Sequence, residues 1–263
     1  MGSDGPCRLG VAIFFFVIYF IFATIYFSFV YPRIPQIYKN VNFHKNLSFF
    51  LLPFPWFIFI YFQFADPGEI NEDNVDAYLK IFPYDGIIYT PHECQTLKIP
   101  VVPRSRFCKF SQKRIAKYDH YCPWVIAPVG MKTHRFFLLF LLSIINVSAY
   151  YSYGSFQILY KISLHILAQL HGNNSAERTL KFILYLAGRE AFVIIDAIVL
   201  LAITITMFSF LIQQVINVSK NVTQIESDKY LIAEHDLGHP VENIYSKGFW
   251  GNWKEELFPP KVI

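Results

Sequence analysis

The chain has 263 residues, of which 54% are hydrophobic, 19% are aromatic and 16% are charged. This apolar content is higher than that of ordinary soluble domains and predicts an integral membrane protein. The net charge of +4 suits attraction to the anionic headgroups of a lipid bilayer. The basic residues lie between apolar runs and form no nucleic-acid recognition motif, so we exclude nucleic acid as a partner.

Four runs of residues are apolar enough to cross a bilayer, since a helix spanning about 30 Å of hydrocarbon needs roughly 20 apolar residues. They occupy residues 9–31, 47–64, 136–160 and 191–218. The first three carry no charge, and the fourth carries only Asp196. An ionised group inside a bilayer is costly, so Asp196 either serves function or hydrogen-bonds to a neighbouring helix. We expect the packing role, with Asn146, Ser148 or a tyrosine of the third run as the partner.

The segments between these runs predict the topology. Residues 65–135 hold ten of the 23 lysines and arginines, whereas residues 32–46 hold three and residues 161–190 hold four. Because basic residues collect on the cytosolic side of membranes, we expect 65–135, the tail at 219–263 and both termini in the cytosol, and 161–190 in the lumen. Residues 65–135 contain several prolines and show neither helical nor strand periodicity. The predicted fold is therefore an all-α integral membrane protein, in which an irregular cytosolic catalytic domain lies between transmembrane helices 2 and 3 of four.

The residues suited to chemistry lie together in one stretch, Asp119 to Cys122, just before the third apolar run. A cysteine attacks as its thiolate, and an adjacent imidazole oriented by a carboxylate is a common means of activating it. An isolated Cys/His pair is more often a packing or capping pair, but here the pair coincides with an acid at the border of the basic domain. We therefore predict Cys122 as the nucleophile, His120 as the base and Asp119 as the residue that orients the base.

These residues resemble a motif of the DHHC protein S-acyltransferases, also called palmitoyltransferases. Four sequence features carry the resemblance, and they follow one another in the order that the family shows. They are Asp66-Pro67-Gly68 after the second run; the segment from Pro103-Arg104-Ser105 and Cys108 through Asp119, His120, Tyr121 and Cys122 to Pro123-Trp124, Val129-Gly130 and Phe136; Thr223-Gln224-Ile225-Glu226 after the fourth run; and Asn243, Tyr245, Gly248 and Asn252 in the tail. The first feature is also an ordinary turn that ends a helix, and the third replaces the second threonine of the family's TTxE motif.

The resemblance implies acyl transfer in two steps. Cys122 takes a long-chain acyl group such as palmitoyl from acyl-CoA, and a cysteine of a membrane-associated substrate protein then receives it. Four basic residues either contact the CoA phosphates or form a solvated face toward anionic lipid: Arg104, Arg106, Lys132 and Arg135. Two other classes stay open, a catalytically inactive membrane scaffold and, less favoured because few polar groups lie within the runs, a transporter. We expect the protein in an endomembrane, the ER or the Golgi.

Members of the family usually hold two structural zinc ions in this domain, each bound by three cysteines and one histidine. Counted from Cys122, the ligand positions are Cys94, Leu97, Phe107 and Arg114 for one ion, and Cys108, Ser111, Tyr121 and Pro128 for the other. One cysteine remains at each site, whereas structural zinc needs a closed tetrahedral shell. We therefore expect no bound zinc and no other cofactor. A Cys94–Cys108 disulfide is not expected in the reducing cytosol, so we expect apolar packing to replace the metal, among Phe107, Phe110, Tyr118, Tyr121 and Trp124.

Overall fold

The structure is a computed structural model that describes residues 5–169 and 175–262, and the chain divides into two compact units. The helical unit comprises Ile13–Phe57 and Leu141–Ser209. The site unit comprises Met1–Ala12, Ile58–Phe140 and Phe210–Ile263.

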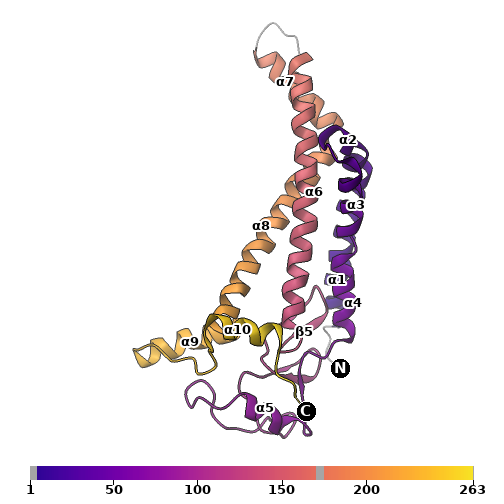
Figure 1. Ribbon diagram of the computed structural model, residues 1–263. Coiled ribbons are helices and arrows are strands. Elements are labelled where there is room, and N and C mark those ends of the chain that lie inside the picture. Colours follow the sequence, from indigo (N-terminus) through magenta and orange to yellow (C-terminus); the bar gives the residue numbers. More distant parts are fainter. Residues whose placement is uncertain (1–4, 170–174, 263) are drawn as a thin grey trace. The chain divides into compact units, whose positions relative to one another are not determined.

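Four helical segments of the described chain are long and apolar enough to span a membrane: Gly10–Ile37, Val41–Phe64, His134–Gln169 and Ala191–Lys220. They confirm the four predicted spans. The first contains all but the first turn of α1 (Gly5–Ile25), then a π-helical turn at Tyr26–Val30, a 3-10 turn at Tyr31–Arg33 and α2 (Ile34–Ile37). The second consists of α3 (Val41–Leu51) and α4 (Phe54–Phe64), separated beside Pro53, which lacks a backbone donor. The third and fourth are the long single helices α6 (His134–Gln169) and α8 (Ala191–Lys220) of Figure 1.

The segment at 161–190, where the mixed stretches 162–170 and 180–186 predict interfacial helices, is largely helical. α6 continues through it to Gln169 and α7 covers Ser175–Arg189, while residues 170–174 lie outside the described residues. α6 continues past the apolar run that ends at residue 160, because Lys161 ends that run but is itself a good helix former. None of the described residues of α7 is buried, which suits a helix lying at a membrane interface.

Packing in the helical unit centres on the stacked rings of Tyr26 and Tyr151, whose centroids lie 3.9 Å apart. Ser48 joins both tyrosines. Its hydroxyl hydrogen-bonds to the Tyr26 hydroxyl at 3.1 Å, and its carbonyl accepts from the Tyr151 hydroxyl at 2.9 Å. The polar ends of two buried rings are thus satisfied inside the unit, as a buried tyrosine requires.

Asp196 is fully buried in the helical unit and accepts a hydrogen bond from Ser155 Oγ at 2.6 Å. The expectation that Asp196 bonds to the third span is confirmed, but the predicted partners are wrong. Asn146 donates to the carbonyl of Leu142, and Ser148 donates to the carbonyl of Ile144. Small polar side chains on a helix readily bond to their own backbone in this way, so Asn146 and Ser148 are already engaged.

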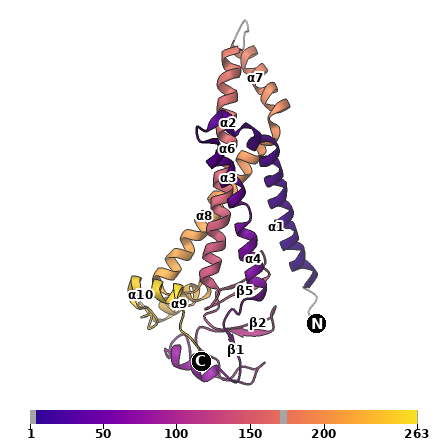
Figure 2. The same ribbon diagram turned by 45° about the vertical axis from the view of Figure 1, so that its right-hand side comes forward.

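The site unit contains two small antiparallel sheets. In the first, β3 (Lys113–Ile115) lies between β1 (Glu69–Ile70) and β2 (Arg106–Cys108), and in the second β4 (His120–Cys122) pairs with β5 (Ala127–Val129) (Figure 2). The helices α5 (Val75–Ile81), α9 (Gln224–Leu237) and α10 (Gly248–Leu257) complete the unit. The prediction of an irregular domain at 65–135 missed β1 to β5 and α5. Strands of two or three residues are too short to show a period-two pattern, and α5 has only seven residues.

The apolar core of the site unit lies around α5. Tyr78 of this helix is fully buried, and Val102, Ala116 and Tyr245 belong to the same cluster. The expected aromatic cluster around Tyr121 is wrong in part. Phe110 packs on Tyr121 with ring centroids 4.6 Å apart, but Phe110 and Trp124 are 46% and 37% exposed. These aromatic rings therefore do not close a core in place of a metal ion.

Gly130 joins the turn after the second span to the end of β5. A Cβ atom at this position would lie 2.4 Å from a side-chain carbon of Ile115 and 2.6 Å from the carbonyl oxygen of Pro67. The turn itself is closed by Asp66, whose carboxylate accepts the backbone N–H groups of Gly68 and Glu69 at 2.9 Å. The Asp66-Pro67-Gly68 feature thus forms a turn that packs directly against the hairpin that carries His120 and Cys122.

Candidate active site

The three residues predicted for catalysis lie at one edge of the β4–β5 hairpin. Side chains alternate between the two faces of a strand, so His120 and Cys122 share one face of β4 while Tyr121 points to the other. Cys122 is buried at 2% exposure, and the side chain of His120 is 26% exposed. The strand therefore brings thiol and imidazole together by its period alone.

Asp119 precedes the strand and is buried at 2% exposure. Its Oδ2 accepts a hydrogen bond from His120 Nδ1 at 2.7 Å. The ring of Phe137 packs edge-on against the imidazole, with centroids 4.8 Å apart. The carboxylate and Phe137 fix the orientation of the His120 ring, which leaves Nε2 as the atom available for proton transfer.

The electrostatics of the group favour a charged imidazole. Burial by itself lowers the pKa of His120, but hydrogen bonds to Asp119 and Cys122 outweigh it and raise this pKa to about 9. Burial by itself raises the pKa of the Asp119 carboxyl, but the hydrogen bond from His120 holds this pKa below its ordinary value. The charged imidazole of His120 therefore lies beside the sulfur of Cys122, an arrangement typical of activated cysteine nucleophiles.

Asp119 is also anchored to the first turn of α9. Its Oδ1 accepts the backbone N–H of Gln224 at 2.7 Å, and the positive end of a helix dipole favours an anion there. Thr223 and Glu226 form a capping box, in which each side chain accepts the backbone N–H of the other residue. The Thr223-to-Glu226 motif therefore builds the helix end that binds the carboxylate of Asp119.

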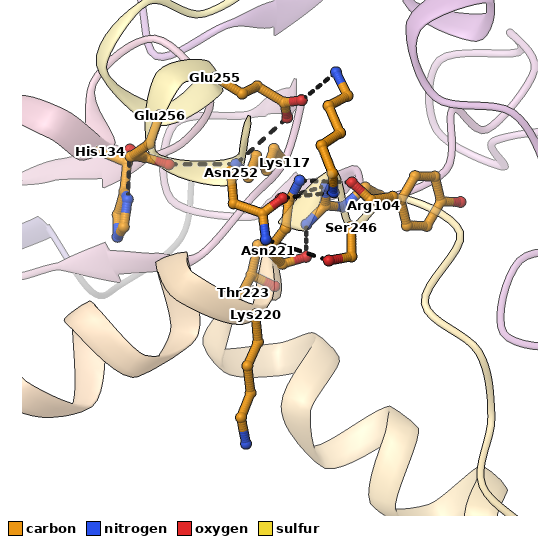
Figure 3. A network of polar contacts seen from close by, with 12 residues as sticks. Arg104, Lys117, His134, Lys220, Asn221, Thr223, Ser246, Asn252, Glu255 and Glu256 are labelled. Carbon is orange, nitrogen blue, oxygen red and sulfur yellow. Dashed lines mark hydrogen bonds and ion pairs between the residues drawn. The ribbon is translucent and has the colours of Figure 1, made fainter. Parts of the chain in front are cut away.

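Arg104 holds the N-terminal end of α9 in place by hydrogen bonds (Figure 3). Its Nε and Nη2 donate to the two carboxylate oxygens of Glu226 at 2.8 Å, and its Nη1 and Nη2 donate to Asn221 at 3.0 and 2.9 Å. The side chain of Arg104 is 0% exposed. The prediction that Arg104 contacts CoA phosphates is therefore wrong, because its guanidinium is enclosed and already bonded.

The other three basic candidates differ in how they are engaged. Lys132 is partly exposed and pairs with Asp66 at 2.6 Å. Arg135 donates to the carbonyl of Leu257 at 2.6 Å and lies over the Phe136 ring. Arg106 is exposed on β2. Contact of these three side chains with CoA phosphates stays a prediction.

A second polar group borders Asp119 and was missed from the sequence. Glu256 of α10 accepts from His134 Nδ1 at 2.8 Å and from Lys117 Nζ at 3.3 Å, and Figure 3 shows His134 and Lys117 converging on it. These residues and Asp119 line a cavity of about 10 Å³, the size of one water molecule. The available signal was the spacing of Glu256 four residues after Asn252, which places both on one helix face.

Two pairs of the implied zinc-ligand positions lie opposite each other on hairpins of the site unit. Phe107 and Arg114 are direct cross-strand partners in β2–β3, and Tyr121 and Pro128 are partners in β4–β5. Side chains at opposed positions on a hairpin are close enough to bind the same metal ion. The two sites are thus recognisable in the fold, although the side chains that would bind metal are replaced.

The side chains present at these two places do not fit zinc. Cys94 accepts a hydrogen bond from Arg114 Nη2 at 3.2 Å, and Cys108 is hydrogen-bonded by the hydroxyl of Tyr118. Within the described part of the chain, no three His, Cys, Asp or Glu residues are grouped so that they could hold a metal ion. Cys94, Cys108 and Cys122 are free thiols.

Comparison with known proteins agrees with this arrangement. Residues 87–230, more than half of the chain, match the family model of the DHHC palmitoyltransferases. Palmitoyltransferase SWF1 of Yarrowia lipolytica is 34% identical over 128 residues, covering 48% of this chain and 34% of the relative. Palmitoyltransferase swf1 of Schizosaccharomyces pombe is 32% identical over 121 residues (45% and 33%), and mouse palmitoyltransferase ZDHHC4 is 28% identical over 119 (45% and 31%). The matched regions span about a third of the length of these relatives.

The chain has four helices apolar enough to span a membrane. It also has a buried cysteine that is hydrogen-bonded to a histidine, and an aspartate orients that histidine. These are the features of a membrane protein with a cysteine nucleophile. The match over residues 87–230 then places the chain more narrowly. It belongs to the DHHC palmitoyltransferase family.

Proposed function

We propose that the protein is a protein S-palmitoyltransferase, which moves a long-chain acyl group from acyl-CoA to cysteines of membrane-associated proteins. One observation carries the proposal: Asp119, His120 and Cys122 are connected by hydrogen bonds in the order acid, base, nucleophile. This is the general arrangement of an activated nucleophile. The family and the names of the similar proteins support it.

In the first step, the thiolate of Cys122 attacks the carbonyl carbon of the acyl-CoA thioester. The bond from this carbon to Cys122 Sγ forms, and the bond to the CoA sulfur breaks. The departing CoA thiolate takes the proton of His120. The products are the S-acyl enzyme, free CoA and a neutral imidazole held by Asp119.

In the second step, a cysteine of the substrate protein gives its proton to His120 and attacks the acyl carbon. Cys122 leaves as thiolate, so the starting charge pair is restored. Each step exchanges one thioester for another and stays near energetic balance. The contribution of the protein is therefore positioning and the supply of a thiolate.

The membrane location follows from the acyl chain. At about 0.8 kcal/mol for each buried methylene, a palmitoyl chain strongly prefers hydrocarbon, so the nucleophile must meet the thioester at the bilayer boundary. The excess of lysine and arginine in 65–135 supports a cytosolic site unit with both chain termini on the same side. We assign the protein to an endomembrane, the ER or the Golgi, where cytosolic acyl-CoA is accessible.

We also propose that catalysis proceeds without zinc or another cofactor. The support is chemical, because Leu97, Phe107 and Pro128 have no side-chain electron pair to offer a metal. For the CoA phosphates, Arg106 and Lys132 are the better candidates, since both side chains reach solvent. Arg135 is a weaker one, because it is already bonded to Leu257.

The test is thioester labelling of the purified full-length protein in detergent or nanodiscs. A clickable palmitoyl-CoA analogue should label the wild type, and hydroxylamine should remove the label because it cleaves thioesters. Cys122→Ser should carry no such label. Cys108→Ser is the matched control, since Cys108 is also a buried free thiol of the site unit, and it should still label.

Two results would contradict the proposal. Equal labelling of wild type and Cys122→Ser would eliminate the nucleophile. Absence of label in a folded wild type, whatever acyl length is offered, would favour the inactive scaffold. For the transporter class, solute flux in proteoliposomes that persists in Cys122→Ser would be the deciding observation.

A further inference from the structure

We propose that the guanidinium of Arg114 replaces the missing zinc ion at the Cys94 site, as the cation that holds three segments of the site unit together. The proposal concerns the stability of the fold and does not depend on acyl transfer. Arg114 stands at one of the implied ligand places, and it bonds to Cys94, which is the ligand that remains.

Cys94 presents its sulfur from a compact turn. Its backbone N–H bonds to the carbonyl of Ile99 at 2.8 Å, and the N–H of Lys98 bonds back to the Cys94 carbonyl at 2.9 Å. Backbone N–H groups of Thr96 and Leu97 are hydrogen-bonded to the sulfur itself. The sulfur of Cys94 thus accepts two backbone hydrogen bonds within the turn. It faces the guanidinium of Arg114, which donates a third.

Arg114 connects this turn to two other segments. Its Nη2 donates to Cys94 Sγ at 3.2 Å, and its Nη1 donates to Ser105 Oγ at 2.9 Å. Ser105 in turn donates to the carbonyl of Val102 at 2.5 Å. Arg114 itself belongs to β3, the central strand of its sheet. One buried cation therefore joins the 94–99 turn, the 102–105 segment and the sheet, as a metal ion joins ligands from separate segments.

Burial makes this contact stronger than a surface pair. Arg114 is 7% exposed and Cys94 is 3% exposed, so water competes little for either group. The planar fork of arginine offers two directed donors, whereas lysine offers a single strongly hydrated point charge. The chemistry of the place therefore requires arginine rather than any cation.

The implied ligand positions around Cys108 are joined by contacts of another kind. Cys108 is held by the hydroxyl of Tyr118, and the ligand positions Tyr121 and Pro128 are already joined by pairing of β4 with β5. At the Cys94 site, by contrast, the partner of the remaining cysteine is a cation. This difference makes Arg114 the residue to test.

The experiment uses the purified full-length protein, with zinc measured by mass spectrometry and unfolding followed by a thermal scan. We expect less than about 0.1 zinc per chain and an unfolding midpoint that a chelator does not change. Arg114→Met should lower the midpoint by about 5 °C, and Arg114→Lys should recover only part of the loss. Lys109→Met, which removes an exposed cation after β2, should leave the midpoint unchanged.

A double-mutant cycle separates the proposed cross-link from a general packing role. If Arg114 acts through Cys94, the midpoint losses of Arg114→Met and Cys94→Ser should be strongly non-additive in the double variant. Additive losses would overturn the proposal. Near-stoichiometric zinc in the wild type would overturn it as well. If Arg114→Met does not fold, the comparison of Arg114→Lys with Cys94→Ser supplies the same cycle.

Discussion

Asp119 Oδ1 accepts the backbone N–H of Gln224 at 2.7 Å, although 105 residues separate the two in sequence. The other oxygen of the same carboxylate binds His120. The acid of the candidate site thus connects the nucleophile's hairpin to the helix that follows the fourth span. The orientation of the base depends on α9 as well as on β4.

Asp119→Asn should slow acyl-enzyme formation by about 100-fold, the lower end of what a positioned acid–base group contributes. The amide can still accept from Gln224, but its NH₂ group facing His120 Nδ1 favours the wrong imidazole tautomer. Single-turnover labelling with the acyl-CoA analogue measures this rate. Asp228→Asn, an exposed position on α9, is the control, and equal rates for wild type and Asp119→Asn would remove Asp119 from the site.

The stability contributed by His120 should depend on pH in a defined window. Its pKa in the folded protein is raised to about 9 from an ordinary 6.5, so the fold stabilises the protonated form. This contribution is complete below pH 6.5 and is lost as the pH rises through about 9. The midpoint difference between wild type and His120→Gln should therefore shrink over this window.

The control for that measurement is His235→Gln, because His235 is exposed on α9. Its midpoint should follow the wild type at every pH. A difference for His120→Gln that stays constant from neutral to alkaline pH would mean that the imidazole is neutral in the fold, which would contradict the raised pKa of His120.

Replacing Arg104 should destabilise the site unit. Arg104→Met leaves the carboxylate of Glu226 buried without its partner, and breaking such a pair typically costs about 3–5 kcal/mol. Arg104→Lys keeps the charge but loses the two-pronged contact, so it should recover less than half. Denaturant unfolding measures both variants. If Arg104→Met unfolds like the wild type and only weakens acyl-CoA binding, the residue belongs to the CoA site after all.

Gly130→Ala should reduce the yield of folded protein sharply. The new methyl group would lie 2.4 Å from an Ile115 side-chain carbon and 2.6 Å from the Pro67 carbonyl, so the hairpin or the preceding turn must move. Gly188→Ala on α7 meets nothing within 4 Å and should be tolerated. Size-exclusion profiles of the two variants decide, and a monodisperse Gly130→Ala protein of normal yield would contradict the close approach.

The sequence was sufficient for those features that depend on composition and short spacing. Run length predicted the four spans, because the hydrocarbon thickness fixes the number of apolar residues. The period of a strand explains why His120 and Cys122, two residues apart, share one face. The count of ligand positions from Cys122 was also informative, since Phe107 and Arg114 are cross-strand partners in the fold.

The sequence could not show which charges are buried against which. Arg104 resembled a surface cation suited to phosphate, yet long-range folding encloses it with Glu226, 122 residues away. Glu256 and His134, equally distant in sequence, gave no local signal of their pairing. Composition and period therefore determined the spans and the candidate nucleophile, because both depend on neighbouring residues. Tertiary structure alone decided which arginine stabilises the fold, because burial of an ion pair depends on segments that meet only after folding.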